Sequence, residues 1–82
     1  MYHVYILYSQ SIDRFYVGYT NILERRIREH NRKKGKYTDA GLPWELAHIE
    51  SFEKKKDAMD REKFIKSKKL RKYIEILIAG EG

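Results

Sequence analysis

Residues 4–19 read VYILYSQSIDRFYVGY, and this stretch decides the fold. It contains two short runs rich in β-branched and aromatic residues, 4–8 and 15–19, which is typical of strands. The segment between the runs is rich in polar turn formers, so the economical connection is a hairpin. Such a hairpin brings Tyr5 and Tyr16 close together.

A first helix is predicted at about 21–34, where apolar side chains recur at helical spacing. Asn21 and Glu24 have the spacing of a capping box at its start, with Asn in place of Ser or Thr. Gly35 can end the helix, because glycine readily adopts the backbone conformation that follows a helix. Residues 36–43 contain glycine and proline breaks and are predicted to form a loop.

Residues 44–52 alternate apolar and polar side chains, with His48 the exception. This predicts a third strand with one solvated face. Two helices follow, at about 55–66 and 68–78, and Ser67 is a plausible N-cap for the last. The order ββαβαα predicts an α+β fold, in which helices pack on a small three-stranded, mainly antiparallel sheet.

The length and composition limit the class of protein. A chain of 82 residues fits a single domain, 1–82, because two separate cores would each be too small to fold alone. The absence of cysteine excludes disulfides, thiolate metal sites and thiol nucleophiles. No apolar run has the length of a membrane span, and the N-terminus lacks the features of a signal peptide. We therefore expect a soluble cytoplasmic protein with no membrane partner.

The charge distribution points to a polyanionic partner. Eighteen Lys and Arg face twelve Asp and Glu, which gives a net charge of +6. The basic residues gather in two blocks, within 21–36 and 54–72. Each block alone could be a solvated helix face, but two blocks on one small domain favour contact with nucleic acid phosphates.

Two charged residues stand where periodicity predicts apolar side chains. Glu62 lies four residues after Ala58 and three before Ile65, on the stripe that should face the sheet. A carboxylate there needs a cation, several hydrogen bonds or a metal, and a structural ion pair with an arginine is the plain alternative. Arg26 similarly shares a helix face with His30, although it could also extend past the apolar edge into solvent.

Several motifs occur in a fixed order: His3-Val4-Tyr5, Tyr16-Val17-Gly18, the segment 21–26 with His30, and Glu62 with Ile65-Lys66. Over about residues 2–66 this order resembles the GIY-YIG nucleases. It is closest to the small stand-alone members and is similar to the N-terminal nuclease domain of excinuclease C. The resemblance implies that the catalytic residues are Tyr5, Tyr16, Arg26, His30 and Glu62.

The resemblance also implies a role for each of these residues. Glu62 would bind one divalent cation, Mg²⁺ or Mn²⁺, and Arg26 would hold the non-bridging phosphate oxygens. Tyr16 would deprotonate the attacking water, Tyr5 would orient that water or Tyr16, and His30 would position Tyr16 or a phosphate. The residues expected to contact nucleic acid are Gly18, Arg25, Lys33, Lys34, Lys63 and Lys66.

The chain departs from the family pattern at a few positions. His3 stands where the first motif begins with glycine, Val17 replaces isoleucine, and Tyr19 stands where excinuclease C has lysine. Residues 71–75 read RKYIE, without the asparagine that several members place after the glutamate.

The predicted function is a metal-dependent endonuclease that hydrolyses phosphodiester bonds in DNA with low sequence specificity, possible structure selectivity and a link to DNA repair. A protein partner could supply specificity. The alternatives are a non-catalytic nucleic-acid-binding module of the same fold, with Glu62 merely paired to Arg26, and a protein-interaction adaptor.

Overall fold

The computed structural model describes residues 1–32, 35, 37–68 and 71–80. Three antiparallel strands form its sheet in the order β2-β1-β3, so β1 is the central strand. The strands are β1 (Tyr2–Ser9), β2 (Arg14–Thr20) and β3 (Trp44–Phe52). The predicted α+β fold and the element order ββαβαα are confirmed.

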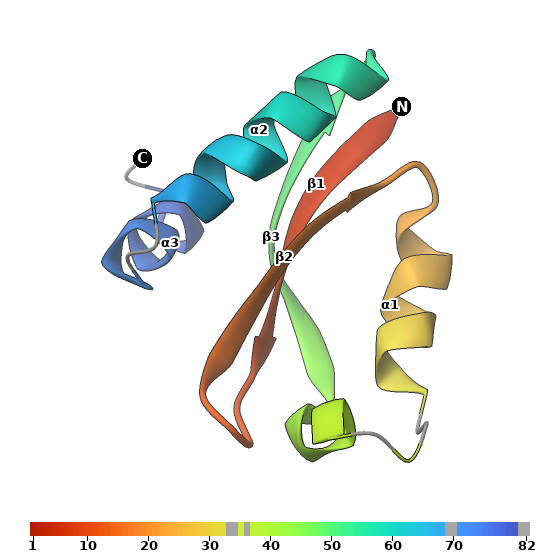
Figure 1. Ribbon diagram of the computed structural model, residues 1–82, viewed down its shortest axis with the longest axis vertical. Coiled ribbons are helices and arrows are strands. Elements are labelled where there is room, and N and C mark those ends of the chain that lie inside the picture. The colour runs from red at the N-terminus through yellow and green to blue at the C-terminus, as the bar shows by residue number, and fades with distance from the viewer. Residues whose placement is uncertain (33–34, 36, 69–70, 81–82) are drawn as a thin grey trace.

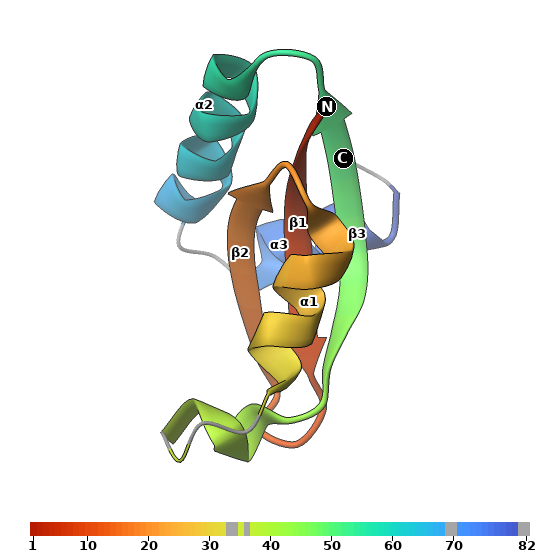
Figure 2. The same cartoon turned by 90° about the vertical axis from the view of Figure 1, so that its right-hand side faces the viewer.

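The helices lie on both faces of this sheet (Figure 1). Helix α1 (Leu23–Asn31) covers one face, while α2 (Lys55–Ser67) and α3 (Arg71–Ile78) cover the other, as the second view also shows (Figure 2). A short 3-10 helix, η1 (Tyr37–Gly41), lies within the segment predicted to be a loop. None of the helices in the described part of the chain has the length and apolar character that crossing a membrane requires.

The central strand explains why the first run of the sequence is continuously apolar. Val4 and Ile6 are fully buried on the side of α2 and α3, and Tyr5 and Leu7 are buried on the side of α1. A strand covered on both faces has no solvated positions, so it does not alternate. The core beneath α2 and α3 consists of Val4, Ile6, Val17, Ala58, Ile65 and Leu77. The core beneath α1 consists of Tyr5, Leu7 and Trp44 with Leu23, Ile27 and Leu42.

The bounds of β3 agree with the prediction, but the prediction of one solvated face is wrong. The register between β1 and β3 shifts between Ile6 and Leu7, where β3 contains one extra residue. Trp44 therefore lies on the α1 side, whereas Phe52 packs into the core beneath α2 and α3. A bulge of this kind reverses the faces of the residues that follow it, so even-numbered positions do not share one face.

Both predicted ends of the first helix are wrong. The Asn21 side chain does not cap α1; Ile22 occupies the N-cap position without a side-chain hydrogen bond. The Ile22 amide instead donates to the Thr20 hydroxyl at 3.1 Å, at the end of β2. Helix α1 ends at Asn31, before Gly35, and Arg32 is extended.

The Asn31 side chain forms a clasp between the end of α1 and the start of β3. Its Oδ1 accepts the Trp44 amide N–H at 2.6 Å, and its Nδ2 donates to the Trp44 carbonyl at 3.0 Å. These two bonds satisfy backbone groups at the end of the strand as a neighbouring strand would. Asn31 therefore ties α1 to the sheet directly after His30.

The predicted N-cap of the third helix is also wrong. Ser67 is the last residue of α2, and its hydroxyl donates to the Phe64 carbonyl at 2.7 Å. A serine hydroxyl that bonds back to the preceding turn satisfies a free carbonyl at a helix C-terminus. Helix α3 begins at Arg71, whereas the prediction began it at about residue 68; residues 69–70 lie outside the described residues.

Candidate active site

Tyr5 and Tyr16 meet on the face of the sheet that α1 covers. In the β1–β2 register Tyr5 pairs with Gly18, so Tyr16 lies two positions along the neighbouring strand on the same face. The two rings are stacked with their centroids 6.4 Å apart. Tyr5 is buried, with 2% of its surface exposed, whereas Tyr16 is 43% exposed. The pair therefore combines one enclosed phenol with one that solvent or a substrate can reach.

His30 joins the two tyrosines from the last turn of α1. Its Nε2 lies 3.4 Å from the Tyr5 hydroxyl oxygen, and its ring centroid is 4.4 Å from that of Tyr16. Leu23 and Ile27 pack the inner side of α1 against the sheet, and His30 follows them at helical spacing. The structure thus brings together three residues that stand far apart in the sequence.

Gly18 lies directly beneath the Tyr5 ring. A Cβ atom at Gly18 would be 2.6 Å from the Tyr5 hydroxyl oxygen and 3.2 Å from Tyr16 Cε1. The space above Gly18, a residue predicted to contact nucleic acid, is thus filled by the Tyr5 phenol. The pairing of Tyr5 with Gly18 across the hairpin is the signal that could have shown this.

The surroundings of the Tyr5 hydroxyl keep it protonated. Burial, aided by the neighbouring Tyr16, raises the pKa of the Tyr5 phenol to about 12. The Arg26 guanidinium opposes this rise in pKa, whereas the carboxylates of Glu62 and Glu29 add to it. Charged groups from α1 and α2 therefore act on one phenol, although these helices cover opposite faces of the sheet.

Arg26 and Glu62 each form an ion pair on their own helix. Arg26 Nη1 lies 3.6 Å from Glu29 Oε2, and the Arg26 side chain is 47% exposed. Glu62 Oε1 lies 3.7 Å from Lys66 Nζ, and the Glu62 side chain is only 17% exposed. These partners differ from the Glu62–Arg26 pair that the non-catalytic alternative invoked. Both ion pairs exceed hydrogen-bond length, so a ligand can compete for either residue.

The donor set suits a cation that keeps most of its water. Within the described residues no group of three or more His, Asp or Glu side chains could hold a metal ion. Glu62 supplies one partly buried carboxylate, whose charge helps to raise the pKa of the Tyr5 phenol. Mg²⁺ is commonly held by one or two carboxylates, with water and substrate phosphate oxygens completing its coordination. Glu62 therefore has the chemistry that holding such a cation requires.

The residues predicted to contact nucleic acid have different surroundings. Arg25 projects from α1 with its side chain 67% exposed and pairs with Glu29 at 3.2 Å. Lys63 is exposed on α2, and Lys66 is exposed beside Glu62. Lys33 and Lys34 lie outside the described residues.

Sequence reasoning missed two residues that shape the site. Asn31 holds the end of α1 against β3 next to His30. Arg14, from β2, lines a groove that also includes Tyr16. Arg14 precedes Tyr16 by two positions in a strand, so period-two alternation was a signal that the two share a face.

The chain is similar to proteins of one known family. Residues 1–74 match the GIY-YIG catalytic domain. A UPF0213 protein of Bacillus velezensis is 50% identical over 64 residues, which cover 73% of this chain and 65% of that relative. The match thus spans slightly less than two thirds of that relative's length. A UPF0213 protein of Natronomonas pharaonis is 45% identical over 80 residues, covering 96% of this chain and 92% of the relative.

A solved structure agrees in fold as well as sequence. The solution NMR structure of a UPF0213 protein from Bacillus halodurans is 36% identical and matches with a TM-score of 0.62. The match covers 100% of this chain and 87% of that one. Since the catalytic-domain match includes every residue of the site described above, the chain belongs to the GIY-YIG family, whose domain indicates a nuclease.

Proposed function

We propose that this protein is a metal-dependent endonuclease that hydrolyses phosphodiester bonds in DNA. The observation that carries the proposal is the arrangement around the Tyr5 hydroxyl. Tyr16 and His30 contact Tyr5, and the charges of Arg26 and Glu62 both act on its phenol. A cation-binding carboxylate, a guanidinium and an accessible phenol are the groups that phosphodiester hydrolysis needs.

Glu62 would hold the divalent ion, Mg²⁺ or Mn²⁺, which when bound supplies a Lewis acid for the leaving 3′ oxygen. Arg26 is half exposed and leaves its 3.6 Å contact with Glu29 to donate to the non-bridging oxygens as their negative charge grows. Glu62, through the ion it would hold, thus serves the charge on the leaving oxygen. Arg26 serves the charge on the non-bridging oxygens.

The two tyrosines have separate tasks in this proposal. Tyr16, the accessible tyrosine, would act as a phenolate to accept the proton of the attacking water, and the adjacent His30 ring holds Tyr16 in place. Tyr5 keeps its proton, since the pKa of its phenol is about 12, and orients the water or the Tyr16 oxygen by hydrogen bonding. The contrast in burial between the two phenols supports this division.

We further propose low sequence specificity and a role in DNA repair. The described helices and strands all pack around one sheet, which leaves none of them as a separate DNA-reading domain. Basic residues on α1 and α2 would bind the phosphate backbone, and such contacts do not distinguish one base sequence from another. The similarity to the nuclease domain of excinuclease C supports the repair role.

Plasmid nicking tests the proposal. The unaltered protein should nick supercoiled DNA in Mg²⁺ and not in EDTA. Glu62→Gln should abolish nicking but leave DNA binding equal or tighter, because the change removes the cation site and a repulsive charge together. Glu53→Gln, at an exposed position beyond β3, is the matched control and should nick normally. Equal nicking by Glu62→Gln would refute the metal-binding role, and DNA binding without nicking by any form would favour the non-catalytic alternative.

A further inference from the structure

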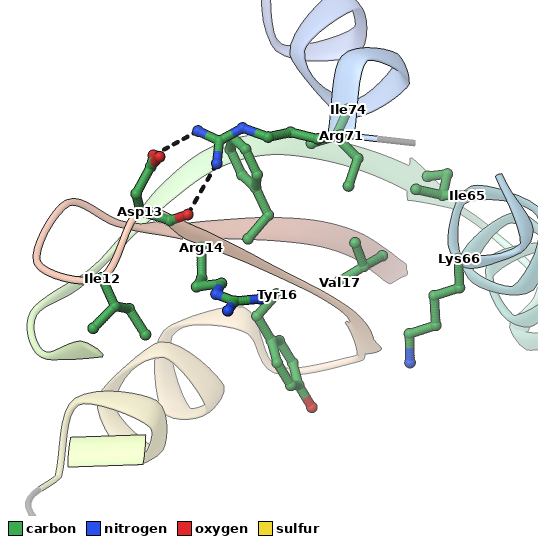
Figure 3. Close-up of a pocket in the computed structure, with 10 residues that line it drawn as sticks. Ile12, Asp13, Arg14, Tyr16, Val17, Ile65, Lys66, Arg71 and Ile74 are labelled. Carbon is green, nitrogen blue, oxygen red and sulfur yellow. Dashed lines mark hydrogen bonds and ion pairs between the residues drawn. The ribbon is translucent and has the colours of Figure 1, made fainter. Parts of the chain in front are cut away.

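A groove runs along the outer edge of β2, facing α2 and α3 (Figure 3). Its volume is about 720 Å³. Residues from both faces of β2 line it, including Tyr16 and Val17, so the groove follows the free edge of this strand. Because Tyr16 belongs to the candidate active site, one end of the groove opens at the point where cleavage is proposed.

The floor of the groove is apolar. Val17, Ile65 and Ile74 line it from β2, α2 and α3. Val17 is 8% exposed and Ile65 is 1% exposed, so the floor continues the hydrophobic core and is rigid. A flat apolar group laid on this surface would lose contact with water on the side that faces the floor.

The rim of the groove carries positive charge near Tyr16. Arg14 is exposed on the same face of β2 as Tyr16, and Lys66 extends from α2 toward the same opening (Figure 3). No ion pair is recorded for Arg14 in the described part of the chain, while Lys66 has only its 3.7 Å contact with Glu62. Both cations are therefore available to an anion.

The one acidic residue of the lining is neutralised. The Asp13 carboxylate accepts hydrogen bonds from Arg71 at 2.5 Å and from the Tyr8 hydroxyl at 2.6 Å. Arg71 also donates to the Asp13 backbone carbonyl at 3.0 Å, which joins the hairpin turn to α3. The charge of Asp13 is thereby balanced by Arg71, and the free positive charge of the lining is that of Arg14 and Lys66.

We propose that this groove binds an unpaired nucleotide of the strand being cut, next to the scissile phosphate. The base would pack on Val17, Ile65 and Ile74, and the adjoining phosphate would contact Arg14 and Lys66. The volume falls in the range of about 300–1,000 Å³ typical of small-ligand pockets, which suits a nucleotide but not a duplex. This inference rests on the proposed nuclease function and adds a substrate class, DNA with an unpaired nucleotide beside the cleaved bond.

Binding measured in EDTA tests the inference without any cleavage. Fluorescence anisotropy would compare a blunt duplex with the same duplex carrying a short thymidine overhang, in both polarities. One overhang should bind at least about tenfold more tightly than the blunt end, on the scale of stacking one base. An abasic overhang of the same charge should lose most of this gain, because it keeps the phosphates but removes the base from the apolar floor.

Two charge-reversal variants, one in the groove and one away from it, test whether the preference for the overhang depends on the groove. Arg14→Glu should remove the preference for the overhang. Lys56→Glu, on the exposed start of α2 and away from the groove, should weaken binding of both duplexes by the same factor. Amide shifts in NMR spectra titrated with a thymidine trinucleotide should concentrate at residues 14–17, 65, 66 and 74.

Equal affinity for blunt, overhang and abasic duplexes would overturn the inference, as would an overhang preference that survives Arg14→Glu. These outcomes are separable from failure of the proposed function. A protein that prefers the overhang but never nicks DNA refutes only the nuclease proposal, and one that nicks DNA without any preference refutes only the groove.

Discussion

Replacing Gly18 with alanine should destabilise the protein, although alanine is usually the better residue inside a strand. Removing the conformational freedom of an interior glycine ordinarily stabilises a protein by roughly 0.5–1 kcal/mol. Here the added Cβ would lie 2.6 Å from the Tyr5 hydroxyl oxygen and 2.8 Å from Tyr5 Cζ. Both distances are too short for carbon contacts, so the ring must move.

The Tyr5 ring has little room to move. It is 2% exposed and belongs to the cluster that Leu7, Trp44 and α1 complete. Overpacking of a close-packed site typically costs about 1–3 kcal/mol. After subtracting the usual gain from alanine, we expect Gly18→Ala to lower the free energy of unfolding by about 1–2 kcal/mol. For a chain of this size the melting temperature should fall by roughly 5–15 °C.

Urea unfolding of a double-mutant cycle is the appropriate assay. Tyr5→Leu removes the two closest atoms that the alanine would meet, and the half-exposed Tyr16 ring can shift at the remaining 3.2 Å contact, so Gly18→Ala should cost nothing, or should stabilise, in that background. The coupling between the two changes should therefore be about 1–3 kcal/mol. If Gly18→Ala is equally costly in both backgrounds, or stabilises the unaltered protein, the argument that Gly18 makes room for Tyr5 is wrong.

Three other predictions concern charge. Arg26→Ala should slow single-turnover cleavage by about 2 kcal/mol or more, the scale of losing one transition-state donor, whereas Arg25→Ala should weaken binding but leave the rate at saturating protein nearly unchanged. If Arg25→Ala were the inactive variant, the assignment of Arg26 would be wrong. DNA affinity should fall steeply with rising salt, because the basic blocks release counterions from phosphates. An affinity that stays the same from low to physiological salt would contradict this. Hydrogen bonds from Arg61 hold the pKa of Glu50 below its usual value of 4.5. Glu50→Gln should therefore reduce stability at pH 7 by about 1–2 kcal/mol, and in urea titrations this loss should disappear as the pH falls below the folded-state pKa of Glu50.

The features that the sequence predicted well depend on contacts that are local or strictly periodic. The hairpin places Tyr5 beside Tyr16 through a short turn, and the 3.6-residue period carries Ile27 and His30 to one side of α1. The burial of Glu62 also followed from its position between Ala58 and Ile65. Such relations need no knowledge of how distant segments pack.

The features that the sequence did not predict depend on how a strand pairs with its neighbour in the sheet, or on which of several similar side chains a residue contacts. The alternation in 44–52 gave no sign that one extra residue would reverse the faces of β3, because a bulge is visible only against the partner strand. The partner of Glu62 is Lys66, one helical turn away, and not the arginine that the structural alternative named. Asn31 resembled an ordinary polar residue at a helix end, and its role depends on Trp44, which is distant in sequence.

The clasp between Asn31 and Trp44 has a consequence for variation in chain length. It joins the two ends of the segment 32–43 to each other, independently of what that segment contains. Residues inserted there would lengthen a closed loop, which costs only about 0.6 kcal/mol for each doubling of its length. His30 would keep its place against the two tyrosines, because it stands on the helix side of the clasp. The part of this segment that precedes Leu42, whose side chain packs in the same core cluster as Tyr5, is therefore where an engineer can insert a binding peptide without disturbing the site.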